Sequence, residues 1–229
     1  MTKQDYIFQG DALEFLNSLP DGSVDAVITD PPYRMLDVWW DKVWESESEY
    51  WCWLESLMIE WHRVLKDQGV FCCFNAMKAK DKMLNLTTRF FESPQLVEWR
   101  KPGAWHNVEI LCFGRKGGEN EIICPSDQLI YDPIPRSIAD RHMCEKPKKL
   151  ADFLVDLCSC PGDLILDSFS GSGAFLSAAK QQGRRFLGSE IDSQWVSRFS
   201  SRLKELQEQS EYEALISMIN QNRKAKYSK

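Results

Sequence analysis

A carboxylate, two prolines and a tyrosine stand directly after a run of apolar residues typical of a buried strand. The stretch reads ITDPPY and ends with Asp30, Pro31, Pro32 and Tyr33. Proline fixes its own φ angle and has no N–H to donate, so two in series stop a strand and stiffen the chain. Such a tip holds a carboxylate and a backbone carbonyl as acceptors beside an aromatic ring. We predict that it does chemistry; an ordinary turn after a strand is the alternative.

A second motif has the order strand, small-residue loop, helix, and reads LILDSFSGSGAF over residues 164–175. Gly171 and Gly173 can adopt backbone angles barred to other residues and let a ligand approach closely. Asp167 ends the strand, and Glu190 lies 19 positions after Gly171, the spacing with which Rossmann folds hold ribose hydroxyls. Neither a full G-x-G-x-x-G nor a P-loop is present, which disfavours a diphosphate. S-adenosylmethionine fits, because it has ribose hydroxyls, a positive end and no phosphate; a tight turn without a ligand is the alternative.

Alternating strand and helix patterns must position both motifs. They predict an α/β fold, Rossmann-like, with a mostly parallel, twisted, doubly wound sheet and helices on both faces. We expect residues 1–229 to form a single domain with a loop-rich insert at about 114–140, where Gly, Pro, Asp and Ser collect. The predicted strands are Tyr6–Phe8, Val24–Thr29, Val70–Phe74, Val97–Trp99, Val108–Phe113, Leu164–Asp167 and Arg185–Ser189, and the predicted helices are 10–19, Glu47–Leu65, Lys78–Phe91, Pro147–Leu157, Ala174–Gln182 and Ser193–Gln209.

Composition narrows the classes of function. The net charge is −6, so contact with nucleic acid would have to rest on a local basic patch. No apolar stretch approaches about 20 residues, and the first ten residues lack a secretion signal, so we expect no membrane span and a cytoplasmic protein. The eight cysteines form no C-x-x-C pair and the three histidines have no metal-type spacing. We therefore expect no metal and buried, reduced thiols.

Taken together, the motifs resemble those of the DNA amino-methyltransferases that act on the exocyclic amines of adenine or cytosine. The sequence is most similar to the circularly permuted group, in which the DPPY motif precedes the glycine loop. The matching pieces cover most of the chain and are GDALEFLNSLPDGSVDAVITDPPY, WHRVLKDQGVF, VEILCFGRK, HMCEKPKKL, LDSFSGSGAF and RRFLGSEID.

The resemblance implies a role for each matching residue. Glu190 would bind the ribose, Asp11 would lie near the cofactor adenine, and Lys146 would lie near the methionine end. The family usually has proline at position 168 and threonine after the last glycine, where this chain has Ser168, and Ala174 with Phe175. The implied catalytic motif is Asp30, Pro31, Pro32 and Tyr33, and the implied cofactor loop is Asp167, Phe169, Ser170, Gly171 and Gly173.

The DPPY chemistry follows from the electronics of an exocyclic amine, whose lone pair is delocalised into the base. Two acceptors, the Asp30 carboxylate and the Pro31 carbonyl, would favour a pyramidal nitrogen, and Asp30 would stabilise its growing positive charge. Tyr33 would stack on a flipped base. Asp rather than Ser before the prolines favours adenine over N4 of cytosine. Methylation of RNA or of a protein amide is the other alternative, and the motif order favours DNA. A non-catalytic cofactor- or DNA-binding module is the third hypothesis.

The expected partner is DNA. The insert is short for a target-recognition region, so we expect specificity that is loose, brief or shared with a second subunit. The resemblance also implies a homodimer. The resemblance implies a bacterial or phage-encoded enzyme that associates with the nucleoid, with or without a restriction partner. For DNA contact we predict one basic surface made of Arg100, Lys101, Arg115, Lys116, Arg136, Arg141, Lys146, Lys148 and Lys149.

Overall fold

The computed structural model describes residues 5–102, 108–118, 123–135, 142–206 and 208. Every strand and helix predicted from the sequence is present within these residues. Residues 193–206 form the last described helix. The other elements are β1 (Tyr6–Gln9), α1 (Ala12–Ser18), β2 (Val24–Thr29), the 3-10 turn η1 (Trp39–Asp41), α2 (Glu47–Val64), β3 (Leu65–Ala76), the 3-10 turn η2 (Met77–Ala79), α3 (Lys80–Phe90), β4 (Glu92–Arg100), β5 (Val108–Arg115), β6 (Gln128–Ile130), α4 (Lys148–Cys158), β7 (Leu164–Asp167), α5 (Ala174–Gln181) and β8 (Arg185–Glu190).

The described strands form one eight-stranded sheet in the order β1-β8-β7-β2-β3-β5-β4-β6. All neighbours are parallel except β3 with β5 and β5 with β4. The prediction of a mostly parallel sheet is therefore confirmed. Antiparallel pairing places Glu109, at the start of β5, opposite Ala76 at the carboxyl end of β3, so Glu109 lies at the same edge as the end of β2.

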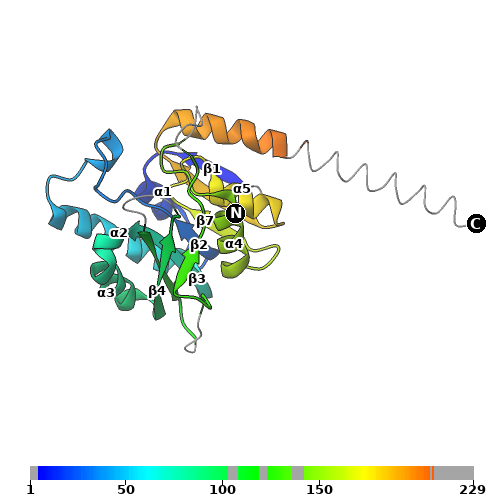
Figure 1. Ribbon diagram of the computed structural model, residues 1–229. Coiled ribbons are helices and arrows are strands. Elements are labelled where there is room, and N and C mark those ends of the chain that lie inside the picture. The colour runs from blue at the N-terminus through cyan, green and yellow to red at the C-terminus, as the bar shows by residue number, and fades with distance from the viewer. Residues whose placement is uncertain (1–4, 103–107, 119–122, 136–141, 207, 209–229) are drawn as a thin grey trace, which may run out of the picture.

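Helices cover both faces of this sheet (Figure 1). Helices α1, α2 and α3 pack on one face, and α4 and α5 pack on the other. Side chains of β3 alternate between the two cores: Cys72 and Phe74 lie on the α4–α5 side, and Phe71 and Cys73 on the α2–α3 side. Both sides of a strand are thus apolar, which explains the continuous apolar runs in the sequence.

Helix α2 begins at a capped end and buries one stripe. The Ser46 hydroxyl accepts a hydrogen bond from the Glu49 N–H at 3.1 Å, which satisfies a free helical donor. Leu54, Met58 and Trp61 are fully buried, as their three- and four-residue spacing predicts. The predicted face also included Trp51, which instead lies at the margin of the stripe and donates its Nε1–H to Glu47 at 3.2 Å.

The predicted insert is only partly irregular. Its segment Gln128–Ile130 pairs in parallel with β4 and forms the edge strand β6. Ile123, Cys124 and Leu129 are buried in the core, and the Gln95 side chain accepts the N–H groups of Ile123 and Cys124. Residues 128–130 are thus a strand, and residues 123–127 form no helix or strand; residues 119–122 and 136–140 lie outside the described part.

The order of strands places a topological switch point between β7 and β2. The chain leaves β2 through α2 on one face, and it leaves β7 through α5 on the other. In open α/β sheets the crevice at the carboxyl ends of two such strands is where ligands bind. The two sequence motifs follow these two strands.

Candidate active site

The ends of β2 and β7 bring the catalytic tip and the cofactor loop side by side. Thr29, the residue before Asp30, donates its hydroxyl to the Asp167 carboxylate at 2.9 Å, although 138 positions separate them in the sequence. The two strands are in register through Val27 and Leu166. Parallel pairing thus assembles one site from motifs that the chain order keeps apart.

The glycine loop needs both of its glycines. Gly171 and Gly173 have φ angles of +48° and +74°, a region that side chains rarely adopt. A Cβ atom on Gly173 would lie 2.1 Å from the Phe199 ring. The Gly171 N–H donates to a Glu190 carboxylate oxygen at 2.7 Å, so Glu190 is held against the loop.

Serine hydroxyls hold the glycine loop by hydrogen bonds, and one of these serines, Ser168, stands where the related family usually carries proline. The Ser168 hydroxyl is buried and accepts the Trp61 Nε1–H at 2.9 Å. The Ser170 hydroxyl donates to the Asp167 carbonyl at 2.9 Å, and the Phe169 ring meets the Trp53 ring edge-on at 5.7 Å between centroids. The departure at position 168 thus has a partner of its own on α2.

Asp11 lies beside Glu190 but caps a helix. Gly10 donates its N–H to the Glu190 carbonyl at 3.0 Å, which places the next residue at the same edge. The Asp11 carboxylate accepts the N–H groups of Leu13 and Glu14 at 2.9 and 3.1 Å. Asp11 is therefore the N-cap of α1.

The acids of this edge have raised pKa values. Burial raises the pKa of Asp167 to about 7, against hydrogen bonds from Phe169 N–H and Thr29 that lower it. Burial also raises the pKa of Glu190. Buried carboxylates gain from a ligand that brings positive charge. A sulfonium and an ammonium group next to ribose hydroxyls therefore suit this set of residues.

The DPPY tip is fixed from outside by a tyrosine. Tyr50 of α2 donates its hydroxyl to the Pro32 carbonyl at 3.1 Å and accepts from the Asn75 amide at 3.0 Å. Beyond the tip, the buried Asp41 carboxylate accepts the N–H groups of Arg34, Met35 and Leu36. Sequence reasoning missed both Tyr50 and Asp41.

Of the three tryptophans that follow the tip, two are committed to packing. Trp44 is buried against Tyr50 and Trp53. The Trp40 ring stacks on His142 with 6.0 Å between centroids. Trp39 is 59% exposed and is the one whose ring is open to a partner.

Lys146 lies on Asp30 rather than on the surface. Its side chain is 5% exposed, and its ammonium group donates to Asp30 Oδ2 and lies 3.2 Å from Glu109 Oε2. Tyr33, expected to offer a ring face, donates its hydroxyl to Asp30 Oδ1. The missed residue here is Glu109; its signal was a charged side chain within the otherwise apolar VEILCF strand.

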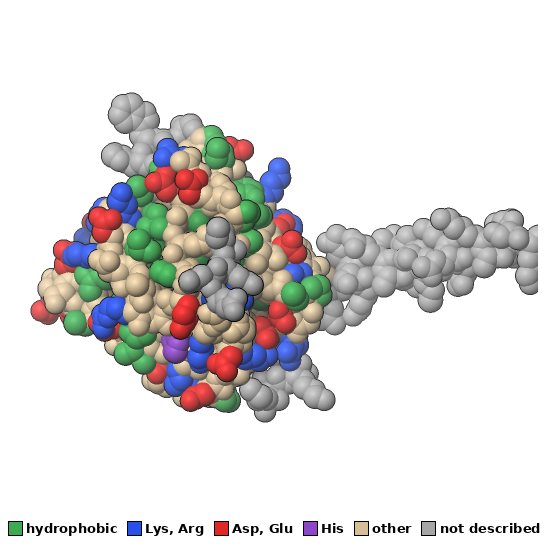
Figure 2. Space-filling model, turned by 90° about the horizontal axis from the view of Figure 1, so that it is seen from below, with side chains coloured by type: hydrophobic (Ala, Val, Ile, Leu, Met, Phe, Trp, Pro, Cys, Tyr) green, Lys and Arg blue, Asp and Glu red, His purple; other side chains and the backbone are tan. Residues whose placement is uncertain are grey.

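The basic residues predicted to form a single surface do not gather. Arg100 lies where β4 ends and Arg115 where its partner β5 ends, which are opposite ends of the same antiparallel pair. Lys146 is buried. Figure 2 shows one face of the molecule, on which Lys and Arg are interspersed with Asp and Glu. The single basic surface is therefore wrong; Arg136 and Arg141 lie outside the described residues.

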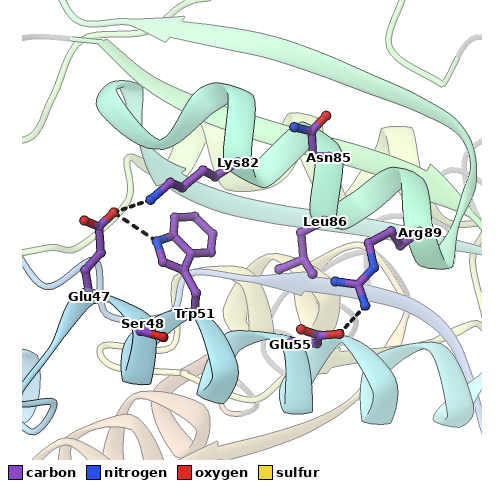
Figure 3. Close-up of a pocket in the computed structure, with 8 residues that line it drawn as sticks. All are labelled: Glu47, Ser48, Trp51, Glu55, Lys82, Asn85, Leu86 and Arg89. Carbon is purple, nitrogen blue, oxygen red and sulfur yellow. Dashed lines mark hydrogen bonds and ion pairs between the residues drawn. The ribbon is translucent and has the colours of Figure 1, made fainter.

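A separate pocket of about 490 Å³ opens between α2 and α3. Figure 3 shows its charged side chains paired across the opening, Lys82 with Glu47 and Arg89 with Glu55. None of its lining residues belongs to the predicted site, so it is distinct from the crevice at β2 and β7. The lining residues are Glu47, Ser48, Trp51, Glu55, Lys82, Asn85, Leu86 and Arg89.

The described residues contain no cluster of three or more His, Cys, Asp or Glu placed to hold a metal ion. Within the same part of the chain, no helix is long and apolar enough to cross a membrane. All eight cysteines are free, and the expected burial holds for most of them; Cys144 is half-buried, while Cys52 and Cys160 are exposed.

Comparison with known families identifies the class that this fold and site define. The sequence matches the N6/N4 DNA methylase family over residues 24–110 and 116–201. The chain belongs to this family of S-adenosylmethionine-dependent DNA methyltransferases.

Two curated relatives agree with this assignment. The DNA adenine methyltransferase YhdJ of Escherichia coli strain K12 is 25% identical over 239 residues, covering 83% of this chain and 79% of that protein. The type II methyltransferase M.BglII of Bacillus subtilis is 26% identical over 240 residues, covering 83% of this chain and 66% of that protein.

Solved structures share the fold. The cytosine-N4-specific PvuII DNA methyltransferase superposes with a TM-score of 0.72 at 19% identity, over 87% of this chain and 86% of that one. The putative DNA modification methylase TTHA0409 of Thermus thermophilus, solved with S-adenosyl-L-methionine, gives 0.68 at 25% identity, over 86% and 92%. The M1.HpyAVI complex with the same cofactor gives 0.66 at 20% identity, over 86% and 98%.

Proposed function

We propose that this protein transfers the methyl group of S-adenosylmethionine to the exocyclic amine of adenine in DNA, after flipping the base. The observation that carries the proposal is the contact between Thr29 and Asp167. It supports the proposal because it ties the end of β2, which Asp30 follows, to the end of β7, where the glycine loop begins, at the switch point of the sheet. Methyl transfer needs the amine and the cofactor to meet at one point, and this edge supplies it.

The cofactor residues are those of the β7–β8 edge. Glu190 binds the ribose hydroxyls, and Asp167 faces the positive end of the cofactor. Asp11 lies near the adenine of the cofactor. Lys146 lies near the methionine end of the cofactor and contacts Asp30. The loop that admits the cofactor consists of Phe169, Ser170, Gly171 and Gly173. When bound, the cofactor supplies an electrophilic methyl group.

The DPPY residues prepare the amine. Asp30 Oδ and the Pro31 carbonyl accept its two N–H groups and favour a pyramidal nitrogen with a localised lone pair. Pro32, whose carbonyl is held by Tyr50, keeps the two acceptors at a fixed spacing. Tyr33 lies next to Asp30 and stacks on the extruded base.

Adenine is favoured over N4 of cytosine by two observations. Asp30 stands where cytosine enzymes of the family more often carry serine, and YhdJ is a DNA adenine methyltransferase. The test is incubation with labelled S-adenosylmethionine and unmethylated DNA, RNA or protein, followed by mass analysis of the product. We expect N6-methyladenine in DNA; N4-methylcytosine, or label in RNA or protein, would contradict the proposal.

Cofactor affinity is expected to rise with pH. The neutral form of Asp167 prevails below its pKa of about 7, and a positive cofactor favours the ionised form. Binding therefore releases a proton, and affinity increases by about tenfold between pH 5.5 and 7.5. Titration calorimetry of Asp167→Asn should give a clearly shallower profile, because Glu190 with its raised pKa remains, while Asp163→Asn, in the turn before β7, should keep the wild-type slope. Equal slopes in both variants would contradict the role of Asp167.

The remaining features of the proposal concern the whole molecule. Residues 1–229 act as a single methyltransferase domain, and residues 114–140 contact the target sequence. The protein works as a homodimer in the cytoplasm, on the DNA of the nucleoid. The short insert supports the dimer, because a second subunit would enlarge the surface that meets DNA.

A further inference from the structure

Five side chains from four segments, the catalytic carboxylate among them, form one cluster of contacts. Asp30 follows β2 and Tyr33 lies three residues further; Lys101 follows β4; Glu109 lies on β5; and Lys146 precedes α4. Lys146 contacts both Asp30 and Glu109, and Lys101 contacts Glu109 through its other oxygen. Two carboxylates and two ammonium groups thus form one connected network of ion pairs.

The network balances charge in a buried place. The exposed fractions of the side chains are 5% for Lys146, 14% for Asp30 and 18% for both Glu109 and Lys101. Burial alone would raise the pKa of Glu109, but the Lys146 and Lys101 charges outweigh it and lower that pKa. Glu109 is therefore ionised at neutral pH. Removal of Lys146 takes away the ion pair of Asp30, and removal of Glu109 takes away that of Lys101.

Asp30 is engaged at both of its oxygens. The Tyr33 hydroxyl donates to Oδ1, and the Lys146 ammonium donates to Oδ2. An ammonium group in hydrogen-bond contact with the carboxylate weakens Asp30 as an acceptor and opposes positive charge on a neighbouring amine nitrogen. This arrangement therefore hinders Asp30 from serving an amine.

Glu109 is placed to receive both groups. Its Oε2 lies 3.1 Å from the Tyr33 hydroxyl and 3.2 Å from the Lys146 ammonium. Tyr33 has a single phenolic proton, which it can give to Asp30 or to Glu109 but not to both. A small movement of each group from one carboxylate to the other keeps Lys146 paired with Glu109 and frees both oxygens of Asp30 for the amine.

We propose that Glu109 is a positioning residue that takes over Lys146 and the Tyr33 hydroxyl when the target amine engages Asp30. The idea rests on the proposed function, because it assigns the step that frees the catalytic acceptor. Glu109 itself touches neither substrate nor cofactor. Lys146 neutralises Asp30 while the site is empty of a base, and Glu109 holds that charge during transfer.

The test compares Glu109→Gln with Glu98→Gln in single-turnover methylation of DNA. Glu98 lies on the neighbouring strand β4 and pairs with Arg100 at 2.6 Å, so it is a matched control. We expect Glu109→Gln to lower the rate at least about tenfold with unchanged cofactor affinity. The acidic limb of the pH–rate profile should also move to lower pH, because the Glu109 charge helps to raise the pKa of Asp30.

Glu109→Asp separates charge from reach. It keeps the negative charge but withdraws it from Tyr33 and Lys146, so we expect a slower rate with the acidic limb unmoved. This variant also decides the matter if Glu109→Gln does not fold. Wild-type rates in both Glu109 variants, or slow transfer in Glu109→Gln with an unmoved limb, would overturn the inference alone. Failure of the wild type to methylate DNA would overturn the proposed function and this inference with it.

Discussion

Asp30→Ala is expected to lower methyl transfer by about 10²–10³-fold while cofactor binding persists. The carboxylate accepts an N–H of the amine and stabilises the positive charge that the nitrogen gains with the methyl group. Both contributions arise during transfer, so the loss should fall on the chemical step. The cofactor loop is built on β7 and keeps the Thr29 contact, so it does not need the Asp30 side chain.

Single-turnover rates with labelled cofactor and calorimetric binding measure the two effects separately. The control is Asp37→Ala, an exposed carboxylate seven residues further along that pairs with Lys42 at 2.5 Å. It should leave both quantities unchanged. A near-normal rate in Asp30→Ala would remove Asp30 from the mechanism, and loss of cofactor binding would mean that it serves the cofactor site instead.

Lys146→Met is expected to lower the free energy of unfolding by about 3–5 kcal/mol, because it leaves two buried carboxylates without their shared cation. Burial and the neighbouring Glu109 charge already raise the pKa of Asp30, and Lys146 opposes that rise. Without the lysine the pKa of Asp30 rises further, and the pKa of Glu109 loses one of the charges that lower it. The deficit should therefore shrink as the pH falls and the acids bind protons.

Urea unfolding at pH 5 and pH 8 gives this difference directly. Lys148→Met is the control, since Lys148 is 60% exposed and pairs with Asp152 across one helical turn; exposed pairs of this kind contribute about 0.3–0.5 kcal/mol. If Lys146→Met costs no more than the control, the pair with Asp30 does not hold the site together.

Local patterns in the sequence were sufficient for most of the fold. The apolar runs of β2 and β7, the serine cap of α2 and the glycines of the cofactor loop act over a few residues, so each could be predicted. Strand β6 could not, because three residues form a strand only when an edge such as β4 offers hydrogen bonds.

The site was predictable in its motifs and not in its contacts. Asp30 follows β2 and Asp167 ends β7, and the family resemblance assigned a role to each. The partner of Lys146 depends on where β5 crosses the sheet, which no local pattern encodes. The prediction of a single basic surface failed for the same reason. Arg100 and Arg115 lie at opposite ends of the antiparallel pair of β4 and β5, and the sequence does not show how these strands pair.

The Asp41 carboxylate has a consequence for association. It accepts hydrogen bonds from three successive backbone N–H groups, so residues 34–41 already have a defined conformation in the free protein. Met35 and Trp39 lie in this segment, and more than half of the surface of each is exposed. A segment shaped in advance loses little freedom when a second molecule settles on it, so more of the contact energy remains as affinity.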